Sequence, residues 1–170
     1  GVAYLSKDFI KLMEILIDAE MKMFRGINTP VIFIQNVVVD LILGLKLYDI
    51  FAEYDAYIRK KYKAEPGYIT MNLPALLGAL KIAGVENPIV CSSINKIGFR
   101  MSGGIEAYEK CLAEENFRPV AMQVLAAGAL RPKEAIEYLG RFPQIESVLF
   151  GASSKAHIQE TKEIIEKFIH

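Results

Sequence analysis

The chain repeats one pattern five times, in which a short apolar run leads to a corner of small or polar residues and then to an amphipathic helix. Proline opens four of the five runs and the fifth follows Pro143 closely; the runs are residues 30–34, 66–71, 88–91, 119–122 and 147–150. Proline lacks an N–H group and fixes φ, so a sheet tolerates it mainly at the first residue of a strand. Apolar runs that alternate with helices therefore predict an α/β protein with a parallel sheet.

The expected elements follow from this pattern. Apolar residues at helical spacing, with their flanking capping residues, predict helices over residues 6–26, 48–62, 74–84, 105–115, 132–140 and 155–168. Strands are expected over residues 31–35, 68–71, 89–94, 120–125 and 147–150. Residues 37–45 are apolar except for Asp40, so the pattern there fits a buried helix and a loop equally well.

Length and composition favour one soluble α/β domain over residues 1–170. No linker divides the sequence, and 170 residues can bury a sizeable core. Basic and acidic residues balance at 20 each, and no basic stripe carries aromatic residues, which argues against a nucleic-acid partner. Cys91 and Cys111 lack the spacing of metal ligands, so we expect no metal site and a reducing, cytoplasmic location. The apolar stretch 30–45 is too short for a membrane span, and the start lacks a signal-peptide pattern.

Two architectures fit five such units. One is an open, doubly wound sheet of the flavodoxin-like kind. The other is the C-terminal part of a TIM-type (β/α)₈ barrel, which typically needs about 250 residues. Small residues at 126–128 and 151–154 follow the last two expected strands, where barrels commonly bind phosphate at a helix N-terminus. We therefore expect an incomplete barrel, with the doubly wound sheet as the alternative.

Residues 118–165 resemble the C-terminal portion of the aldo/keto-reductase-like barrels. The resemblance lies in the strand 119–122 before Gly128 and Leu130, the helix 134–139, the strand with its corner 148–154, and His157-Ile158, and it covers roughly a quarter of the chain. It implies the barrel fold and a phosphate-binding region that takes NADPH or another phosphorylated ligand. The family's catalytic residues come from the first half of the barrel, and Lys155 is the one candidate here for gripping an adenosine phosphate. The resemblance thus implies no hydride transfer, and it extends equally to barrel families without assigned chemistry.

Candidate ligand-binding residues come from the ends of the expected strands, because parallel sheets bind ligands beyond the carboxyl ends of their strands. These residues offer amides, hydroxyls or open backbone: Asn36, Asn72, Ser93, Asn95, Gln123, Gly128, Gly151, Ser153 and Ser154. Such groups can hydrogen-bond a neutral or anionic ligand. Asn and Ser also suit strand-to-helix corners through local backbone hydrogen bonds, which is the alternative interpretation.

Residues 151–154 are the best candidate for an anion site. A helix N-terminus offers free N–H groups and the positive end of the dipole, and small residues let a phosphate approach closely. The alternative is that Ser153 or Ser154 only caps the last helix. Gly128, after the preceding strand, makes the two interpretations equally plausible.

Two residues are candidates for catalysis. Lys96 ends an expected strand, where a buried lysine can attack a carbonyl and form a Schiff base, although a solvated lysine is the alternative. Asp40 can act as a general base or orienting group, or can cap a helix. Arg100 can clamp a carboxylate or phosphate, although a surface arginine is the simpler interpretation.

We therefore expect a barrel-like protein, derived from an enzyme, that binds a phosphate-containing ligand or nucleotide at its last two units. One alternative is a Schiff-base carbon–carbon lyase that uses Lys96. Another is a non-catalytic assembly module. Five strands leave two unpaired edges beside an apolar face, so a second copy, a partner chain or a further segment of a longer parent protein is expected to complete the barrel.

Overall fold

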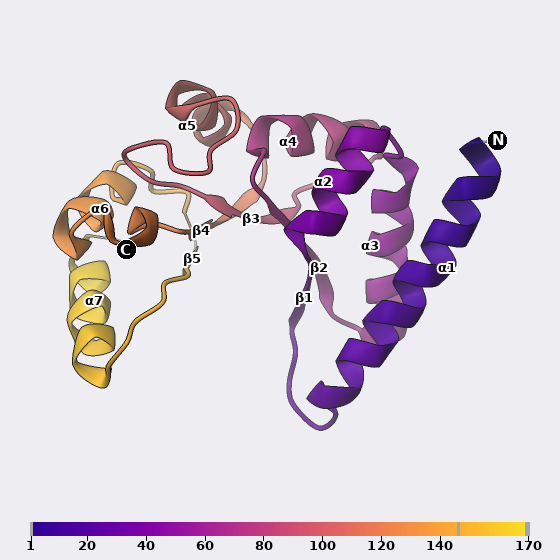
Figure 1. Ribbon diagram of the computed structural model, residues 1–170, viewed down its shortest axis with the longest axis horizontal. Helices are drawn as coiled ribbons and strands as arrows, with labels where there is room; N and C mark the ends of the chain where they lie inside the picture. The colour runs from indigo at the N-terminus through magenta and orange to yellow at the C-terminus, as the bar shows by residue number, and fades with distance from the viewer. Residues whose placement is uncertain (1, 146, 169–170) are drawn as a thin grey trace.

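A computed structural model describes residues 2–145 and 147–168 and shows an α/β chain with one parallel sheet (Figure 1). The described strands are β1 (Val31–Ile34), β2 (Glu65–Thr70), β3 (Ile89–Ser93), β4 (Arg118–Met122) and β5 (Ser147–Val148). The described helices are α1 (Val2–Met21), α2 (Asn36–Leu45), α3 (Asp49–Tyr62), α4 (Leu73–Ile82), α5 (Ile105–Glu114), α6 (Pro132–Leu139) and α7 (Lys155–Phe168), with short 3₁₀ turns η1 (Lys22–Phe24) and η2 (Ala126–Gly128). The expected α/β class with a parallel sheet is confirmed.

The strands lie in the order β1-β2-β3-β4-β5, and each pairs in parallel with the next. In Figure 1 the helices stand around this sheet, from α1 and α3 at one end to α6 and α7 at the other. The sheet is open within the described residues, which is compatible with a partial TIM-type barrel and with an open α/β sheet. A flavodoxin-like sheet reverses its strand order at one point, whereas barrel strands follow one another around the ring. The sequential order therefore favours the partial barrel.

Two prolines lie one residue inside their strands rather than at the first residue, namely Pro66 in β2 and Pro119 in β4. Glu65 donates its N–H to the carbonyl of Pro30 over 2.8 Å, so the position of the missing N–H of Pro66 faces β3. Pairing between β2 and β3 begins only at Gly67. The N–H group that Pro66 lacks would therefore have pointed to a part of the sheet where β2 and β3 are not yet paired. Pro119 has the same place in β4, where pairing with β5 begins only at Val120.

Helices bury the face of the sheet that carries Tyr68. Its ring makes edge contacts with Phe51 and Tyr54 of α3, at centroid distances of 5.8 and 5.5 Å. Tyr54 is fully buried and donates its hydroxyl to the carbonyl oxygen of Ile32 over 2.6 Å. The aromatic cluster therefore docks α3 onto both β1 and β2. Because side chains alternate along a strand, Glu65 and Gly67 face the opposite side of the sheet.

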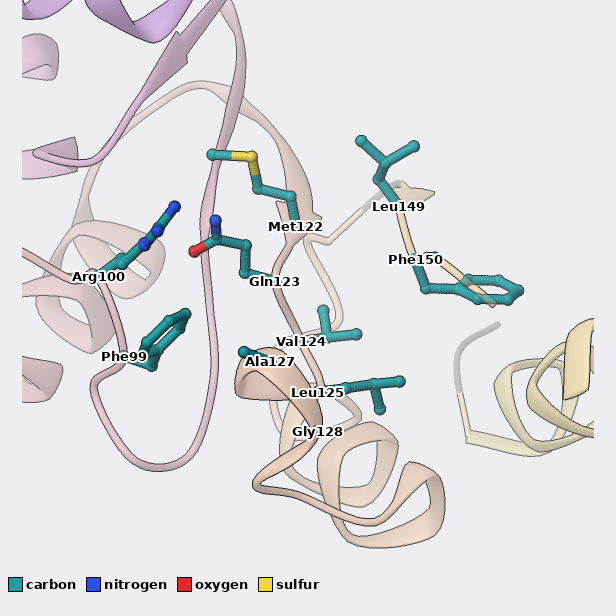
Figure 2. A pocket seen from close by; sticks show the side chains of 11 residues that line it. Phe99, Arg100, Met122, Gln123, Val124, Leu125, Ala127, Gly128, Leu149 and Phe150 are labelled. Atoms are coloured by element: carbon teal, nitrogen blue, oxygen red, sulfur yellow. The ribbon is translucent and has the colours of Figure 1, made fainter. Parts of the chain in front are cut away.

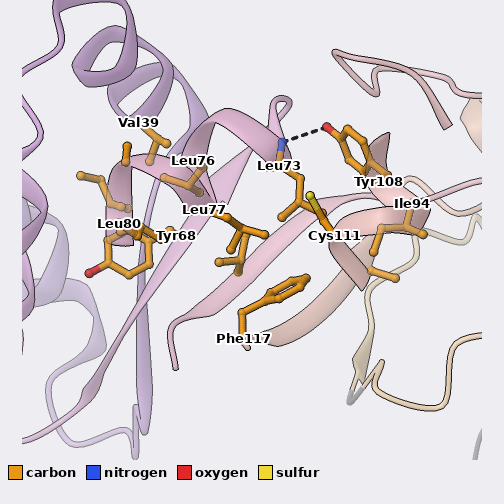
Figure 3. Close-up of a cluster of buried hydrophobic side chains, with 14 of the residues drawn as sticks. Val39, Tyr68, Leu73, Leu76, Leu77, Leu80, Ile94, Tyr108, Cys111 and Phe117 are labelled. Carbon is orange, nitrogen blue, oxygen red and sulfur yellow. Dashed lines mark hydrogen bonds between the residues drawn. The ribbon is translucent and has the colours of Figure 1, made fainter. Parts of the chain in front are cut away.

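The core continues beneath α4 and α5, where apolar side chains of both helices meet (Figure 3). The hydroxyl of Tyr108 in α5 accepts the N–H of Leu73 over 3.1 Å and donates to the carbonyl of Met71 over 2.8 Å. Tyr108 is completely buried, so these bonds satisfy its polar atom. They also fix the corner between β2 and α4, at the carboxyl end of β2.

Several boundaries differ from the expectation. Residues 36–45 form helix α2, so the ambiguous stretch is helical and Asp40 lies inside the helix instead of capping it. Strand β5 is shorter than the expected 147–150, and α1 begins earlier than residue 6. Among the described helices, none combines the length and apolar character needed to cross a membrane.

Candidate functional site

A cavity of about 650 Å³ opens where β4 and β5 end (Figure 2). Its walls are mainly apolar and come from Phe99, Met122, Val124, Leu125, Leu149 and Phe150. Small residues, Ala127, Gly128 and Gly151, widen it, and Arg100 and Gln123 supply polar groups. Figure 2 shows Phe99 and Arg100 on one side of the opening, with Leu149 and Phe150 on the other. Such a mainly apolar cavity with a few polar groups is typical of small-molecule sites.

Three of the nine candidate ligand-binding residues line this cavity: Gln123, Gly128 and Gly151. A fourth, Ser93, supports it from β3, because its hydroxyl donates to Oε1 of Gln123 over 2.9 Å. Ser93 is fully buried, so this bond satisfies its hydroxyl and orients the Gln123 amide. With Oε1 engaged by Ser93, Nε2 of Gln123 is the amide atom suited to donate to a ligand.

The backbone after β4 adopts an unusual conformation that shapes one wall of the cavity. Gln123, Ala126 and Ala127 have φ values of 53°, 46° and 55°, and Gly128 has 90°. For residues other than glycine, this left-handed region costs roughly 1–2 kcal/mol. Strained residues of this kind cluster at functional sites, because the surrounding structure must hold them. The short side chains of this turn keep the cavity open.

Asn95 fixes the loop that forms the opposite wall. Its Nδ2 donates to the carbonyl of Phe99 over 2.9 Å, and its Oδ1 accepts the Phe99 N–H over 2.8 Å. Asn95 is only 1% exposed and does not line the cavity. Asn95 therefore supports the loop at Phe99, the residue directly before Arg100. The guanidinium Cζ of Arg100 lies 5.4 Å from the centroid of the Phe99 ring, within reach of a cation–π contact.

Ser153 and Ser154 lie outside the cavity lining. Ser154 caps α7, since its Oγ accepts the N–H of His157 over 3.2 Å and its carbonyl accepts the N–H of Ile158 over 3.1 Å. Ser153 Oγ lies 3.2 Å from Nδ1 of His157, and both residues are exposed. This geometry favours the capping interpretation, with Ser154 as the cap, and leaves Gly151 as the part of that corner that lines the cavity.

Asn36 and Asn72 belong to other corners of the sheet. Asn36 is the first residue of α2. Asn72 caps α4, because its Oδ1 accepts the N–H of Ala75 over 3.3 Å. The alternative interpretation of Asn as a corner residue thus fits Asn72. Neither asparagine lines the cavity at β4 and β5.

Lys96 lies at the surface, where its Nζ is 2.7 Å from Oε1 of Glu134 in α6. The two side chains are 52% and 46% exposed. A nucleophilic lysine needs burial or apolar surroundings that favour its neutral form. The structure gives Lys96 an ion pair in solvent, which does not support a Schiff-base role.

Asp40 projects from α2 toward the end of β2, where its Oδ1 accepts the hydroxyl of Thr70 over 3.0 Å. Partial burial raises the pKa of Asp40, and the hydrogen bonds from Thr70 and from the Met71 backbone oppose this shift. Thr70 Oγ1 in turn accepts the N–H of Asn72 over 2.8 Å. The carboxylate thus ties α2 to the corner after β2, and it does not line the cavity.

Within residues 2–145 and 147–168 no three side chains of His, Cys, Asp or Glu gather closely enough to hold a metal ion. Cys91 and Cys111 are both buried, and burial raises the pKa of the Cys91 thiol to about 11. Neither thiol is therefore suited to act as a nucleophile at neutral pH.

Comparison with protein-family models, curated proteins and solved structures gives no match for this chain. The resemblance of residues 118–165 to the aldo/keto-reductase-like barrels therefore stays an interpretation of the sequence. The parallel sheet, which is compatible with a partial TIM-type barrel, rests on the structure itself.

Proposed function

We propose that this protein binds a small phosphorylated molecule in the cavity at the ends of β4 and β5. The observation that carries the proposal is the position of the cavity. Ligands of parallel α/β proteins bind beyond the carboxyl ends of the strands, and this cavity lies at two such ends. Gly128 and Gly151, which belong to the expected phosphate-binding region, line this cavity, whereas Ser153 and Ser154 do not.

The cavity residues support an anionic ligand with an apolar part. Arg100 supplies a guanidinium, which pairs well with phosphate oxygens, and the Gln123 amide adds a donor. Gly128 and Gly151 carry no side chain, so a ligand can approach the backbone there. The apolar walls can bury the remainder of the ligand.

NADPH, which the family resemblance implies, does not fit these residues. The cofactor carries several phosphate groups, whereas Arg100 is the one charged side chain among the described residues that line the cavity. Lys155, the candidate partner for an adenosine phosphate, begins α7 and does not line the cavity. The donor set suits a ligand with a single phosphate group.

A titration of the ¹⁵N-labelled protein with phenyl phosphate and with inorganic phosphate tests the proposal. We expect the amide signals of Gln123, Gly128 and Gly151 to shift with a common dissociation constant. Gly151→Val should weaken binding at least tenfold, because Gly151 lines the cavity and a valine there adds bulk to its wall, while a Cβ at this position meets no atom within 4 Å and leaves the fold undisturbed. Gly78→Val, on the exposed side of α4, is the matched control. Shifts confined to other regions, or equal binding by Gly151→Val, would contradict the proposal.

A second candidate function, assembly with further strands, is favoured by an uncovered apolar surface. Leu12, Leu16, Val37 and Leu41 of α1 and α2 are each between 48% and 69% exposed. Leu12, Leu16 and Leu41 line a groove of about 340 Å³ beside β1, the edge strand of the sheet. Strands of a second copy or of a partner chain can pair with β1 and cover this surface.

Native mass spectrometry tests the assembly candidate. If copies of the chain associate, species above the 19.0 kDa monomer should appear, and Leu16→Glu should abolish them. Ile82→Glu, at an exposed apolar residue of α4, is the matched control. A monomer at every concentration would contradict association of copies and leave a partner chain as the candidate.

A further inference from the structure

Arg100 combines an unfavourable backbone conformation with a place in the wall of the cavity. Its φ is 53°, in the left-handed region that residues other than glycine, asparagine and aspartate rarely occupy. The same loop uses glycine at three other positions with positive φ, namely Gly98, Gly103 and Gly104. A glycine at position 100 would be the unstrained solution, yet this position carries a long cationic side chain.

The residues on both sides of Arg100 are anchored, so its backbone is held in place. On one side, Asn95 bonds both backbone groups of Phe99. On the other side, Met101 is 5% exposed, and its N–H donates to the carbonyl of Gly98 over 3.2 Å. Ser102 follows and donates its N–H to the carbonyl of Met71 over 3.0 Å. The anchors place the start of the Arg100 side chain in a fixed position at the cavity.

The other groups around the cavity restrict the chemistry of the rest of the ligand, beyond its anionic group. The walls are apolar, and Gln123 is the one amide side chain among the described lining residues. A sugar would place several hydroxyl groups against these mainly apolar walls, and each hydroxyl that loses water there without gaining a partner is costly. An aromatic or aliphatic body avoids this cost and can lie against the Phe99 ring.

We propose that the cavity selects a monophosphate whose phosphate group is joined directly to an apolar, ring-containing body, with Arg100 as the residue that holds the anion. This inference rests on the proposed function and narrows its ligand class from phosphorylated molecules in general to aryl-type phosphates. It assigns Arg100 as a specificity-determining residue: the guanidinium selects the charge, and the apolar walls select the body.

Three probes separate the two halves of the inference. 1-Naphthyl phosphate carries both the anion and the apolar body, 1-naphthol carries the body alone, and ribose 5-phosphate carries the anion on a polar body. We expect 1-naphthyl phosphate to bind at least tenfold more tightly than either other probe, with shifts of the Gly128 and Gly151 amides. In Arg100→Met the affinity for 1-naphthyl phosphate should fall to the level of the affinity for 1-naphthol. The affinity for 1-naphthol should be the same in Arg100→Met and in the wild type.

Lys63 provides the matched control, because it is also an exposed cation with a φ of 56° and does not line the cavity. Lys63→Met should bind all three probes like the wild type. Arg100→Gly and Lys63→Gly should both raise the melting temperature, since glycine relieves the left-handed strain at each position. Only Arg100→Gly should lose the preference for 1-naphthyl phosphate, which separates ligand binding from a structural role.

The outcomes distinguish this inference from the proposed function. If ribose 5-phosphate binds at Gly128 and Gly151 as tightly as 1-naphthyl phosphate, the proposed function stands and the inference is overturned. Wild-type affinity of Arg100→Met for 1-naphthyl phosphate would also overturn it. If no probe shifts the amides of the cavity, the proposed function itself fails and the inference falls with it.

Discussion

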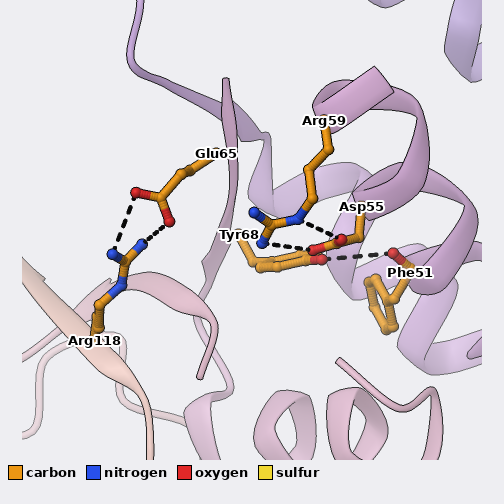
Figure 4. Close-up of polar contacts among 6 residues, drawn as sticks. All are labelled: Phe51, Asp55, Arg59, Glu65, Tyr68 and Arg118. Carbon is orange, nitrogen blue, oxygen red and sulfur yellow. Dashed lines mark hydrogen bonds and ion pairs between the residues drawn. The ribbon is translucent and has the colours of Figure 1, made fainter. Parts of the chain in front are cut away.

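Arg118 of β4 pairs with Glu65 of β2 across the intervening strand β3 (Figure 4). Nη1 of Arg118 lies 3.3 Å from Oε1 of Glu65, and Nη2 contacts Oε2. Both side chains extend from the face of the sheet opposite to Tyr68, which is the face that would line the inside of a barrel. A contact that reaches over one strand is easiest where a sheet curves toward that face, as in a barrel.

This ion pair predicts a measurable coupling between β2 and β4. Glu65→Gln should lower the free energy of unfolding by about 1 kcal/mol, because the side chains are 47% and 26% exposed and solvent screens the pair. Arg118→Met should cost a similar amount, and the double variant should cost less than the sum of the two. Urea denaturation of the four proteins measures this cycle; fully additive losses would mean that the pair contributes nothing.

Gly67 is predicted to be intolerant of a side chain because of Phe33. A Cβ at Gly67 would lie 2.5 Å from Cδ1 and Cε1 of the Phe33 ring, which covers this residue from the neighbouring strand. Gly67→Ala should therefore cost about 1–3 kcal/mol of unfolding free energy. Adding Phe33→Leu should recover part of the loss, while Gly78→Ala, where the Cβ meets nothing, should cost none. If Phe33→Leu brings no recovery, the ring contact is not the cause.

We predict that acid weakens the attachment of α1 to α3, because Asp18 of α1 accepts hydrogen bonds from three side chains of α3. Hydrogen bonds from Lys61, then from Tyr57 and Tyr62, lower the pKa of Asp18 from 3.8 to about 2. A depressed pKa in the folded state stabilises the protein above pH 3.8, and the contribution is lost as the pH falls toward 2. When the pH is lowered from 3.8 to about 2, the melting temperature should therefore fall less in Asp18→Asn than in the wild type, as measured by thermal unfolding at each pH.

The control for this pH dependence is Asp8→Asn, which changes an exposed aspartate on the same helix. It should follow the wild-type curve. Equal losses of stability in the wild type and in Asp18→Asn would show that the cluster does not titrate with folding.

Asn95 is predicted to support both stability and ligand binding. Asn95→Ala removes both hydrogen bonds to the Phe99 backbone in a buried position and should cost about 1–3 kcal/mol. The released loop should also weaken binding of 1-naphthyl phosphate, since Phe99 and Arg100 belong to the cavity wall. Gln144→Ala removes a side-chain bond to the Leu112 carbonyl elsewhere, and it should reduce stability without changing affinity. Unchanged binding by Asn95→Ala would contradict the role of the loop.

The alternation of apolar runs and helices was sufficient to predict the parallel α/β class, because each repeat carries its own turn residues. It was not sufficient for residues 37–45, since Asp40 is the one charged residue in a short apolar run, and such a run does not distinguish a buried helix from other buried structure. The sequential order of the strands depends on crossovers between elements, which no local pattern records. Pro66 was expected at the first residue of its strand but is the second. A strand tolerates proline there because the neighbouring strand β3 begins to pair only at Gly67.

The candidate site was predictable in part. Gln123, Gly128 and Gly151 follow directly from the rule that ligands bind at strand ends. The walls formed by Phe99 and Phe150 were missed, because apolar residues after a strand are indistinguishable from core residues in the sequence. Arg100 was a candidate clamp for a carboxylate or phosphate, with a surface arginine as the simpler interpretation. Its place at the cavity depends on the Asn95 bonds, which exist only in the folded loop.

The most direct test of this account is the crystal structure of the protein with bound 1-naphthyl phosphate. We predict the phosphate within hydrogen-bond distance of the Arg100 guanidinium and the naphthyl ring between Phe99 and Leu149, beside Gly151. A phosphate held at the start of α7 by Ser153 and Ser154, or a ligand found only on the apolar surface of α1, would contradict the central claim.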